Sequence, residues 1–224
     1  MLTIYGADLS SPSNKVRFVA NYSGLHYEYK KVSLKDGENR APAFLKLHPA
    51  GKIPVIDDDG FVLFESNAIC RYLADKNNSP IYPKELKQRA FVEQWTDFAT
   101  NHVGTAMARV LYNRIFAPIR KVEVDERSLK DGLNFLSRFL PVVNNQLAKF
   151  KYFAGDKITL ADFDLLAILD PCEVADVDLA PYQNIVNWRN ELKQQDFYTK
   201  CYKEYGEALK QMAAKEASRT HSKI

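Results

Sequence analysis

Lys52-Ile53-Pro54-Val55-Ile56, followed at a short interval by Phe64-Glu65-Ser66-Asn67-Ala68-Ile69, is the most informative part of this 224-residue chain. The first segment predicts a strand entered through an X-Pro bond, and because proline cannot donate to a sheet ladder, we expect an open sheet edge there. In the second segment Glu65 and Ser66 precede an apolar helical run, where free N–H groups at a helix N-terminus attract a carboxylate. Each segment alone is more typical of an edge strand or a helix cap, but together they predict a cradle for a small anionic peptide.

The composition is that of an ordinary globular protein, with 46% hydrophobic and 26% charged residues. A net charge of +3, with acidic and basic residues interspersed, favours neither a nucleic acid nor a membrane as partner. The chain starts directly with the strand-like run Leu2–Tyr5, and no 18 uncharged apolar residues follow one another. We therefore expect a cytoplasmic protein.

The cysteines and histidines predict no metal or disulfide chemistry. Three cysteines lie far apart without a Cys-x-x-Cys pattern, so we expect buried thiols and neither a disulfide framework nor a zinc site. The histidines also lack ligand spacing, and we expect no metal. The residues are Cys70, Cys172, Cys201, His26, His48, His102 and His221.

The first third of the chain alternates strand and helix signals, and Asp57–Gly60 is a strong hairpin turn signal. This order fits an α/β thioredoxin-like domain with helices on both faces of a mixed sheet. The expected strands are Leu2–Tyr5, His26–Val32, Ile53–Ile56 and Phe61–Phe64, and the expected helices are Ser13–Ser23, Pro42–Leu47 and Asn67–Asp75.

Turn formers and two prolines in Asn77–Pro83 indicate an interdomain linker. Apolar residues then recur at three- and four-residue spacing, which predicts an all-helical second domain. We place the domains at residues 1–78 and 86–224, with a polar tail after about Met212 that we expect to fray. Thr159 and Asp162 form a capping-box-like signal before an apolar run, and we assign them a role in folding only.

The order and spacing of these segments resemble the cytosolic glutathione transferases over nearly the whole chain, with the serine-type phi, delta and theta classes as the most similar. The resemblance implies a thioredoxin-like domain that binds glutathione and an all-α C-terminal domain that contributes the site for an electrophile. It implies no cofactor, since glutathione is a co-substrate. The motifs that carry it are Ser10–Ser13, Gly37–Leu45, His48–Pro54, Phe64–Leu73, Glu93–Trp95 and Phe153–Phe163.

Ser10 is the residue to which the resemblance assigns activation of the glutathione thiol. A model thiol has a pKa near 8.5, so only a few per cent is ionised at pH 7 and the protein must favour the thiolate. A hydroxyl donor beside a helix N-terminus would supply this. Ser11 is the competitor, but we expect it to be the N-cap before Pro12. The Ser10–Ser13 tetrad has no thiol, which excludes dithiol chemistry there.

The resemblance also assigns the groups that bind glutathione. Ile53 would pair its backbone with the cysteinyl part beside a cis Pro54, although most X-Pro bonds are trans. Ser66 would bind the γ-glutamyl carboxylate, and Glu65 its ammonium. Arg40 and Lys52 would face the glycyl carboxylate, with Arg40 where phi members have Lys and Asn39 where they usually have His.

The site for the second substrate is less readable. Leu9, Met107, Leu111 and Phe116 could line an apolar cleft between the domains, and plain helical core is an equally good interpretation of each.

Transfer of glutathione to a hydrophobic electrophile is the favoured function. The same fold also serves as a non-catalytic interaction or ligand-binding domain, as in the gamma subunit of a translation elongation factor. Peroxidase, isomerase and dehalogenase activities on this fold stay open as well. The presence of Ser10, Glu65 and Ser66 together favours an enzyme, and the lack of a further domain after Ile224 argues against the elongation factor. The resemblance further implies a homodimer.

Overall fold

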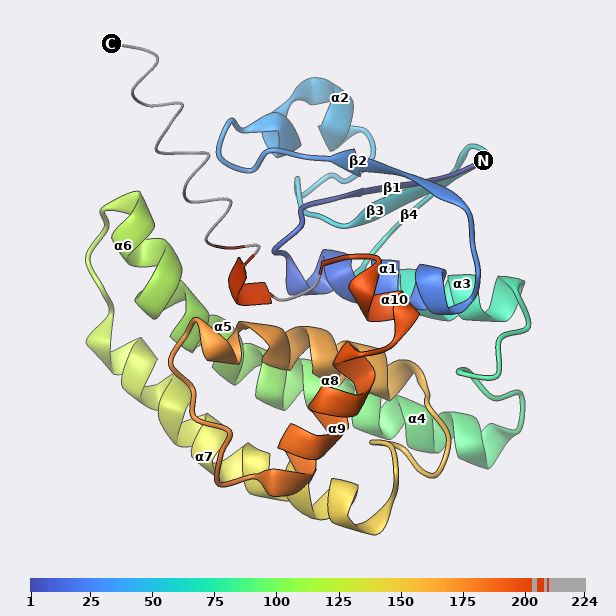
Figure 1. Cartoon of the computed structure of the whole chain (residues 1–224). Helices are drawn as coiled ribbons and strands as arrows, with labels where there is room; N and C mark the ends of the chain where they lie inside the picture. The colour runs from blue at the N-terminus through green and yellow to red at the C-terminus, as the bar shows by residue number, and fades with distance from the viewer. Residues whose placement is uncertain (203–204, 208, 210–224) are drawn as a thin grey trace.

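The computed structural model describes residues 1–202, 205–207 and 209, so the expected polar tail after Met212 and His221 lie outside the described residues. The N-terminal part contains a four-stranded sheet in the order β2-β1-β3-β4 (Figure 1). β1 pairs in parallel with β2, and β3 is antiparallel to both β1 and β4. This is the predicted thioredoxin-like arrangement. The strands are β1 (Leu2–Gly6), β2 (Tyr27–Lys31), β3 (Val55–Asp58) and β4 (Phe61–Phe64).

Helices cover both faces of the sheet, as expected for this order. In Figure 1, α1 (Ser11–Tyr22) and α3 (Ser66–Lys76) lie on the face toward the helical part of the chain, and α2 (Pro42–Leu45) lies on the other face. A short 3₁₀ turn, η1 (Glu38–Arg40), leads into α2. The apolar side chains Val16, Phe18 and Val19 of α1 are fully buried, and the Phe18 ring packs against Phe197 and Tyr198 of α10 (Asp196–Thr199).

The prediction of an open edge at the strand after Pro54 is wrong. β3 starts at Val55, one residue after the proline, and pairs on both sides, with Val55 opposite Tyr5 and also opposite Phe64. Pro54 therefore precedes the ladder, where its missing N–H costs no sheet hydrogen bond. The hairpin turn is also tighter than predicted: Asp59 and Gly60, both with positive φ, connect Asp58 to Phe61.

The second part of the chain is helical. α4 (Leu86–Phe98), α5 (Thr105–Leu111) and α6 (Ala117–Arg120) follow one another without a break, because two π-helical segments, η2 (Ala99–Gly104) and η3 (Tyr112–Phe116), connect them. Of these segments, α5, η2 and η3 pack against the long helix α7, which Figure 1 shows beside them. The remaining elements are α7 (Glu126–Lys149), α8 (Leu160–Leu169), the 3₁₀ turn η4 (Asp170–Glu173), α9 (Gln183–Lys193) and α10 (Asp196–Thr199).

Helix α8 is the centre of the fold. Nearly all its residues are buried, and it packs against α1 from the N-terminal part and against α4 and η2 from the helical part. A helix that is apolar on all sides belongs in the interior, and the run Leu165-Leu166-Ala167 has this character. The predicted capping box of Thr159 and Asp162 is present at its start.

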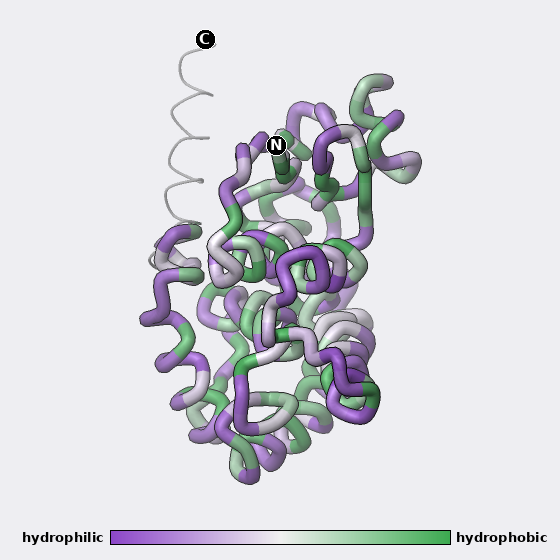
Figure 2. The backbone as a smooth tube through the Cα atoms, turned by 90° about the vertical axis from the view of Figure 1, so that its right-hand side faces the viewer, coloured by the Kyte–Doolittle hydropathy of each residue, from purple (hydrophilic) through white to green (hydrophobic). Residues whose placement is uncertain are grey.

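The outer helices alternate between hydrophobic and hydrophilic residues. Figure 2 shows both kinds interspersed along the tube, as expected for helices with one buried and one solvated face. Among the described residues, none of the helices combines the length and apolar character required to cross a bilayer.

Candidate functional site

Ser10 lies in the loop between β1 and α1 and is the N-cap of α1. Its backbone is extended, with φ −87° and ψ 110°, and its Oγ accepts a hydrogen bond from Ser13 N at 3.3 Å. Its backbone N donates to Ala7 O at 3.1 Å, and its carbonyl accepts from Asn14 N at 2.8 Å. The Oγ bond uses a lone pair, so the hydroxyl can still donate its proton.

The expectation that Ser11 caps the helix is wrong. Ser11 is the first helical residue, and the cap is Ser10. The sequence pointed to Ser11 because proline is favoured at the first helical position, but Pro12 stands at the second position here. Ser10 therefore combines an N-cap with a free hydroxyl proton, next to a helix with no acidic residue in its first turn. A negative charge placed at Ser10 Oγ would meet the positive end of α1.

The Ile53–Pro54 peptide bond is cis, as the resemblance implies. Pro54 is buried and Ile53 is half-buried. Because the ladder of β3 starts at Val55, the backbone of Ile53 lies beyond the sheet pairing. The position is therefore suited to pair with an extended ligand by main-chain hydrogen bonds.

Glu65 and Ser66 form the start of α3. Glu65 is exposed and has φ 72° and ψ 109°, a region that side-chain-bearing residues rarely adopt, and its carboxylate makes no cap to the helix. Ser66 is the first helical residue, and the first turn of α3 carries no acidic residue. The helix N-terminus can therefore attract a carboxylate, while the Glu65 side chain is available to accept from an ammonium group.

Arg40 and Lys52 are brought near each other by a contact between their neighbours. Asn39 Nδ2 donates to Gly51 O at 2.6 Å, which joins η1 to the segment before Pro54. Gly51 has φ +60°, and a Cβ there would lie 2.6 Å from Asn39 O, so the approach requires glycine. Arg40 and Lys52 are both exposed, as surface cations that receive an anion must be. Asn39, where the resemblance implies a His, has a structural hydrogen bond here.

A ring of polar side chains that starts at Asn67, next to Ser66, was missed by the sequence analysis; Lys15 and Asp164 in it are buried, and Asn67 and Thr100 are half-buried. Lys15 Nζ donates to Asn67 Oδ1 at 2.5 Å and forms a close ion pair with Asp164. Asn67 Nδ2 donates to Thr100 Oγ1 at 3.0 Å, and Thr100 Oγ1 donates to Asp164 Oδ2 at 2.5 Å. The ring ties α1, α3 and η2 to α8. One signal was available: a carboxylate inside the apolar run of α8 requires a buried partner.

The four residues expected at the electrophile cleft have different environments. Met107 is 3% exposed in the main core, with its sulfur 3.8 Å from that of Cys172, so it packs as core. Leu111 and Phe116 are half-buried on α5 and η3. Leu9 is half-buried in the β1–α1 loop directly before Ser10. Leu9 is therefore the residue of this set that lies beside the candidate catalytic serine.

Within the described residues, no group of three or more His, Cys, Asp or Glu side chains is arranged to hold a metal ion. The described cysteines are free, with Cys70 and Cys172 buried and Cys201 half-buried. Burial raises the pKa of the Cys70 and Cys172 thiols to about 12, so these two remain protonated and unreactive near neutral pH.

Two family models match this chain. Residues 1–75 match the glutathione S-transferase N-terminal domain, and residues 103–196 match the C-terminal domain of the same proteins. A sequence relative, glutathione S-transferase F10 of Arabidopsis thaliana, is 36% identical over 165 residues, which cover 72% of this chain and 76% of the relative.

Solved structures agree with this. A delta-class glutathione transferase of Nilaparvata lugens has a TM-score of 0.83 and 30% identity, covering 95% of this chain and 98% of its own. A theta-class glutathione S-transferase of Xanthomonas axonopodis pv. citri, solved with glutathione bound, has a TM-score of 0.82 and 25% identity, covering 89% of this chain and 95% of its own.

Fold and matches together define a two-domain transferase of the serine-type classes. The chain belongs to the glutathione S-transferase family.

Proposed function

We propose that this enzyme converts bound glutathione to its thiolate through Ser10 and transfers it to a hydrophobic electrophile. The observation that carries the proposal is the position of Ser10: it is the N-cap of α1, its Oγ accepts from Ser13 N, and its proton remains available for a sulfur anion. To bring the bound thiol about two pKa units below its ordinary value requires roughly 2.7 kcal/mol of preferential stabilisation. One hydroxyl donor and one helix dipole are of the right size for this.

The rest of glutathione would be held by the two loops described above. The backbone of Ile53 would pair with the cysteinyl residue, the N-terminus of α3 at Ser66 would bind the γ-glutamyl carboxylate, and Glu65 would accept from its ammonium group. Arg40 and Lys52 would attract the glycyl carboxylate. This arrangement is supported by the free main chain at Ile53, the α3 N-terminus without an acidic residue, and two exposed cations joined through Gly51.

The test is the pKa of the bound thiol, measured from thiolate absorbance in the ultraviolet. Ser10→Ala should bind glutathione within a few-fold of wild type, because the hydroxyl touches only the sulfur. Its turnover of an aryl halide at pH 6.5 should fall at least tenfold and recover as the pH approaches that of the free thiol. Ser11→Ala is the matched control, with a much smaller change. If the pKa of the bound thiol in Ser10→Ala is the same as in wild type, Ser10 has no part in the mechanism.

A second variant separates binding from chemistry. Ser66→Ala should weaken glutathione binding at least tenfold, because a charge-assisted hydrogen bond is worth about 1.5–3 kcal/mol. The pKa of the thiol that does bind should stay that of wild type. Unchanged affinity in titration calorimetry contradicts this cradle. Folded wild-type protein that is not retained on immobilised glutathione and does not turn over the aryl halide supports the non-catalytic interaction domain instead.

The proposal includes a cytoplasmic homodimer with a role in detoxification. Phe61, Val62 and Phe64 project from the edge strand β4 and are 50%, 36% and 37% exposed, an apolar surface that a second copy would cover. Free cysteines are typical of a reducing compartment. Light scattering at micromolar concentration should give about twice the chain mass. A monomer under these conditions contradicts the assembly.

A further inference from the structure

The loop that presents Ser10 is held by side chains that lie far away in the sequence. Leu9 O, in the peptide directly before Ser10, accepts a hydrogen bond from the Tyr205 hydroxyl at 2.9 Å. Tyr205 is only 2% exposed and comes after α10, near the end of the described chain. The preceding carbonyl, Asp8 O, accepts from Asn14 Nδ2 at 2.7 Å. Two consecutive carbonyls before Ser10 thus have side-chain donors.

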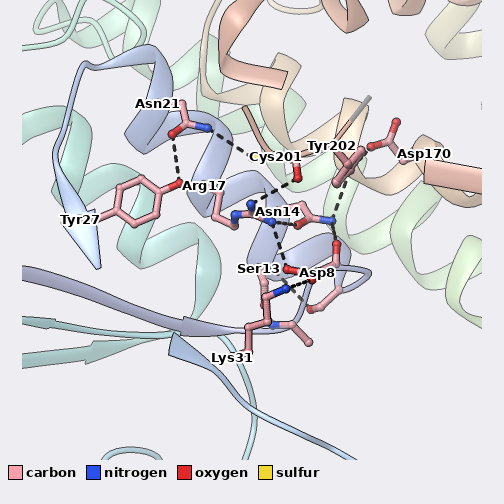
Figure 3. Close-up of polar contacts among 12 residues, drawn as sticks. Asp8, Ser13, Asn14, Arg17, Asn21, Tyr27, Lys31, Asp170, Cys201 and Tyr202 are labelled. Carbon is pink, nitrogen blue, oxygen red and sulfur yellow. Dashed lines mark hydrogen bonds and ion pairs between the residues drawn. The ribbon is translucent and has the colours of Figure 1, made fainter. Parts of the chain in front are cut away.

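Asn14 is itself connected to the same C-terminal segment. Its Nδ2 also donates to the Tyr202 hydroxyl at 3.3 Å, and that hydroxyl donates to Asp170 Oδ2 at 2.5 Å (Figure 3). Asn14 and Asp170 are each 1% exposed, so water cannot readily replace these bonds. The rings of Tyr202 and Tyr205 pack edge to face, with centroids 6.0 Å apart. Asp170 therefore anchors Tyr202 by a hydrogen bond, and ring packing connects Tyr202 to Tyr205.

Both tyrosines stay protonated in the working pH range. Burial, reinforced by the nearby Asp170 carboxylate, raises the pKa of Tyr202 and of Tyr205 above the ordinary value. A protonated hydroxyl at Tyr205 is a donor to Leu9 O at any pH at which the enzyme would work. The hold on the loop is therefore permanent and does not switch with pH.

The geometry makes this hold relevant to Ser10. The Leu9 carbonyl and the Ser10 N–H belong to one planar peptide unit. Tyr205 bonds the carbonyl, and Ala7 O accepts from the N–H at 3.1 Å, so the peptide is fixed from both sides. Its orientation sets the direction in which the Ser10 side chain leaves the backbone. A donor to a sulfur anion must be held within about 0.5 Å of its productive position.

We propose that Tyr205, assisted by Asn14 and Tyr202, is a positioning residue for Ser10 and aims its hydroxyl at the glutathione sulfur. The inference rests on the proposed function, in which Ser10 stabilises the thiolate. Tyr205 does not touch the reacting atoms, and its contribution acts through the Leu9–Ser10 peptide. The segment after α10 is then part of the thiol-activating machinery.

The test compares three phenylalanine variants in the full chain. Tyr205→Phe removes only the hydroxyl and keeps the ring packing. Tyr202→Phe removes the Asp170 bond and the acceptor for Asn14. The control is Tyr198→Phe, which removes a hydroxyl that donates to Asp170 Oδ1 at 3.1 Å. The Tyr198 ring also packs against Tyr202, with centroids 5.1 Å apart. Its hydroxyl is bonded to the end of α8 and not to the Ser10 loop.

For Tyr205→Phe we expect glutathione affinity within two-fold of wild type, a raised pKa of the bound thiol, and turnover at pH 6.5 lowered about five-fold. The loss should disappear near pH 8.5, and Tyr202→Phe should show a smaller loss of the same kind. Tyr198→Phe should leave the thiolate titration unchanged. A merely structural role for Tyr205 would lower stability or the amount of active enzyme without moving the pH profile.

Two outcomes overturn the inference, and they differ from failure of the proposed function. An unshifted thiolate titration in Tyr205→Phe excludes positioning by its hydroxyl, and an equal shift in Tyr198→Phe assigns the effect to Asp170 and its surroundings instead. If wild type itself shows no lowered thiol pKa, or if Ser10→Ala does not change it, the proposed function fails and the inference fails with it.

Discussion

Helix α8 carries a buried aspartate at each end, and the chain holds the two in different ways. Asp162 is in the first turn and is fully buried, and Asp170 follows the last residue and is 1% exposed. Burial raises the pKa of each to about 6. The helix dipole favours a carboxylate at the first position and opposes one at the second. Asp170 therefore needs more help than Asp162 to remain charged at neutral pH.

The donors differ accordingly. Asp162 accepts from the backbone N–H groups of Phe153 and Thr159, both at 2.8 Å, and from Trp188 Nε1 at 3.0 Å. Asp170 accepts from two tyrosine hydroxyls and has the Arg189 guanidinium at 3.9 Å. The first carboxylate organises the start of a helix, and the second connects the helix end to the segment that holds the Ser10 loop. Equal burial thus serves folding at one end and the site at the other.

The largest effect on stability should come from Asp162→Ala. It leaves two buried N–H groups and the Trp188 indole without an acceptor, and each orphaned group costs about 1–3 kcal/mol. We expect the free energy of unfolding to fall by about 3–4 kcal/mol in urea titrations at pH 7. Asp162→Asn, which keeps one acceptor oxygen, should lose less. A loss below about 1 kcal/mol for Asp162→Ala would mean that these bonds do not anchor α8.

The contrast between the two ends shows what the sequence could predict. Thr159 and Asp162 lie three residues apart before an apolar run, so their contact is local and was predicted from the pattern. The alternation of strands and helices, with Asp59-Gly60 as a turn, was readable for the same reason. Pro54 misled the strand prediction, because a proline just before a ladder gives the same signal as one on an edge.

The site was readable only in its local parts. Ser10, Ile53, Glu65 and Ser66 stand in short motifs, and their positions follow from the resemblance and from nearby turns and caps. The contacts behind them join residues that are far apart in the sequence: Tyr205 to Leu9, and Lys15 to Asp164. Such pairs depend on how α1 packs against α8 and against the C-terminal segment. A single sequence carries no periodic or spacing signal for them.

The second-largest effect is the pH dependence of the stability that Asp170 contributes at the C-terminal end of α8. An unfolded aspartate titrates near 3.9, whereas Asp170 titrates at about 6 in the folded state, so the folded protein binds more protons between these values. The contribution of Asp170 to stability therefore falls as the pH rises from about 4 to about 6. The stability of wild type relative to Asp170→Asn should decrease by about 2 kcal/mol between pH 4 and pH 7. A relative stability that is constant with pH would show that the pKa of Asp170 is the same in the folded and the unfolded protein.

A smaller effect tests the other end. Thr159→Ala removes the hydroxyl that donates to Asp162 Oδ2 at 3.2 Å and the cap of α8, but it leaves the carboxylate with its other donors. We expect a loss of about 1 kcal/mol and unchanged turnover. Thr159→Ser, which keeps the hydroxyl, should be close to wild type in the same urea titration. Normal stability together with lost activity in Thr159→Ala would overturn the assignment of this box to folding alone.

The smallest effect should come from Glu173, one turn beyond Asp170. Burial acts to raise its pKa, but hydrogen bonds and charges from Lys193 and Arg189, at 2.9 and 3.3 Å, outweigh it and hold the pKa below the ordinary value. A lowered pKa contributes stability that is present at neutral pH and lost on acidification, the opposite sign to Asp170.

Because the Glu173 side chain is 39% exposed, solvent screens the interaction, and Glu173→Gln should cost only about 0.5 kcal/mol at pH 7. This small difference should disappear toward pH 4, whereas that of Asp170→Asn should grow in favour of wild type. The two variants, measured side by side in urea at pH 4, 5.5 and 7, therefore give slopes of opposite sign. Equal slopes would mean that the pKa values of Asp170 and Glu173 are not shifted in opposite directions, and the contrast between these two carboxylates would then be wrong.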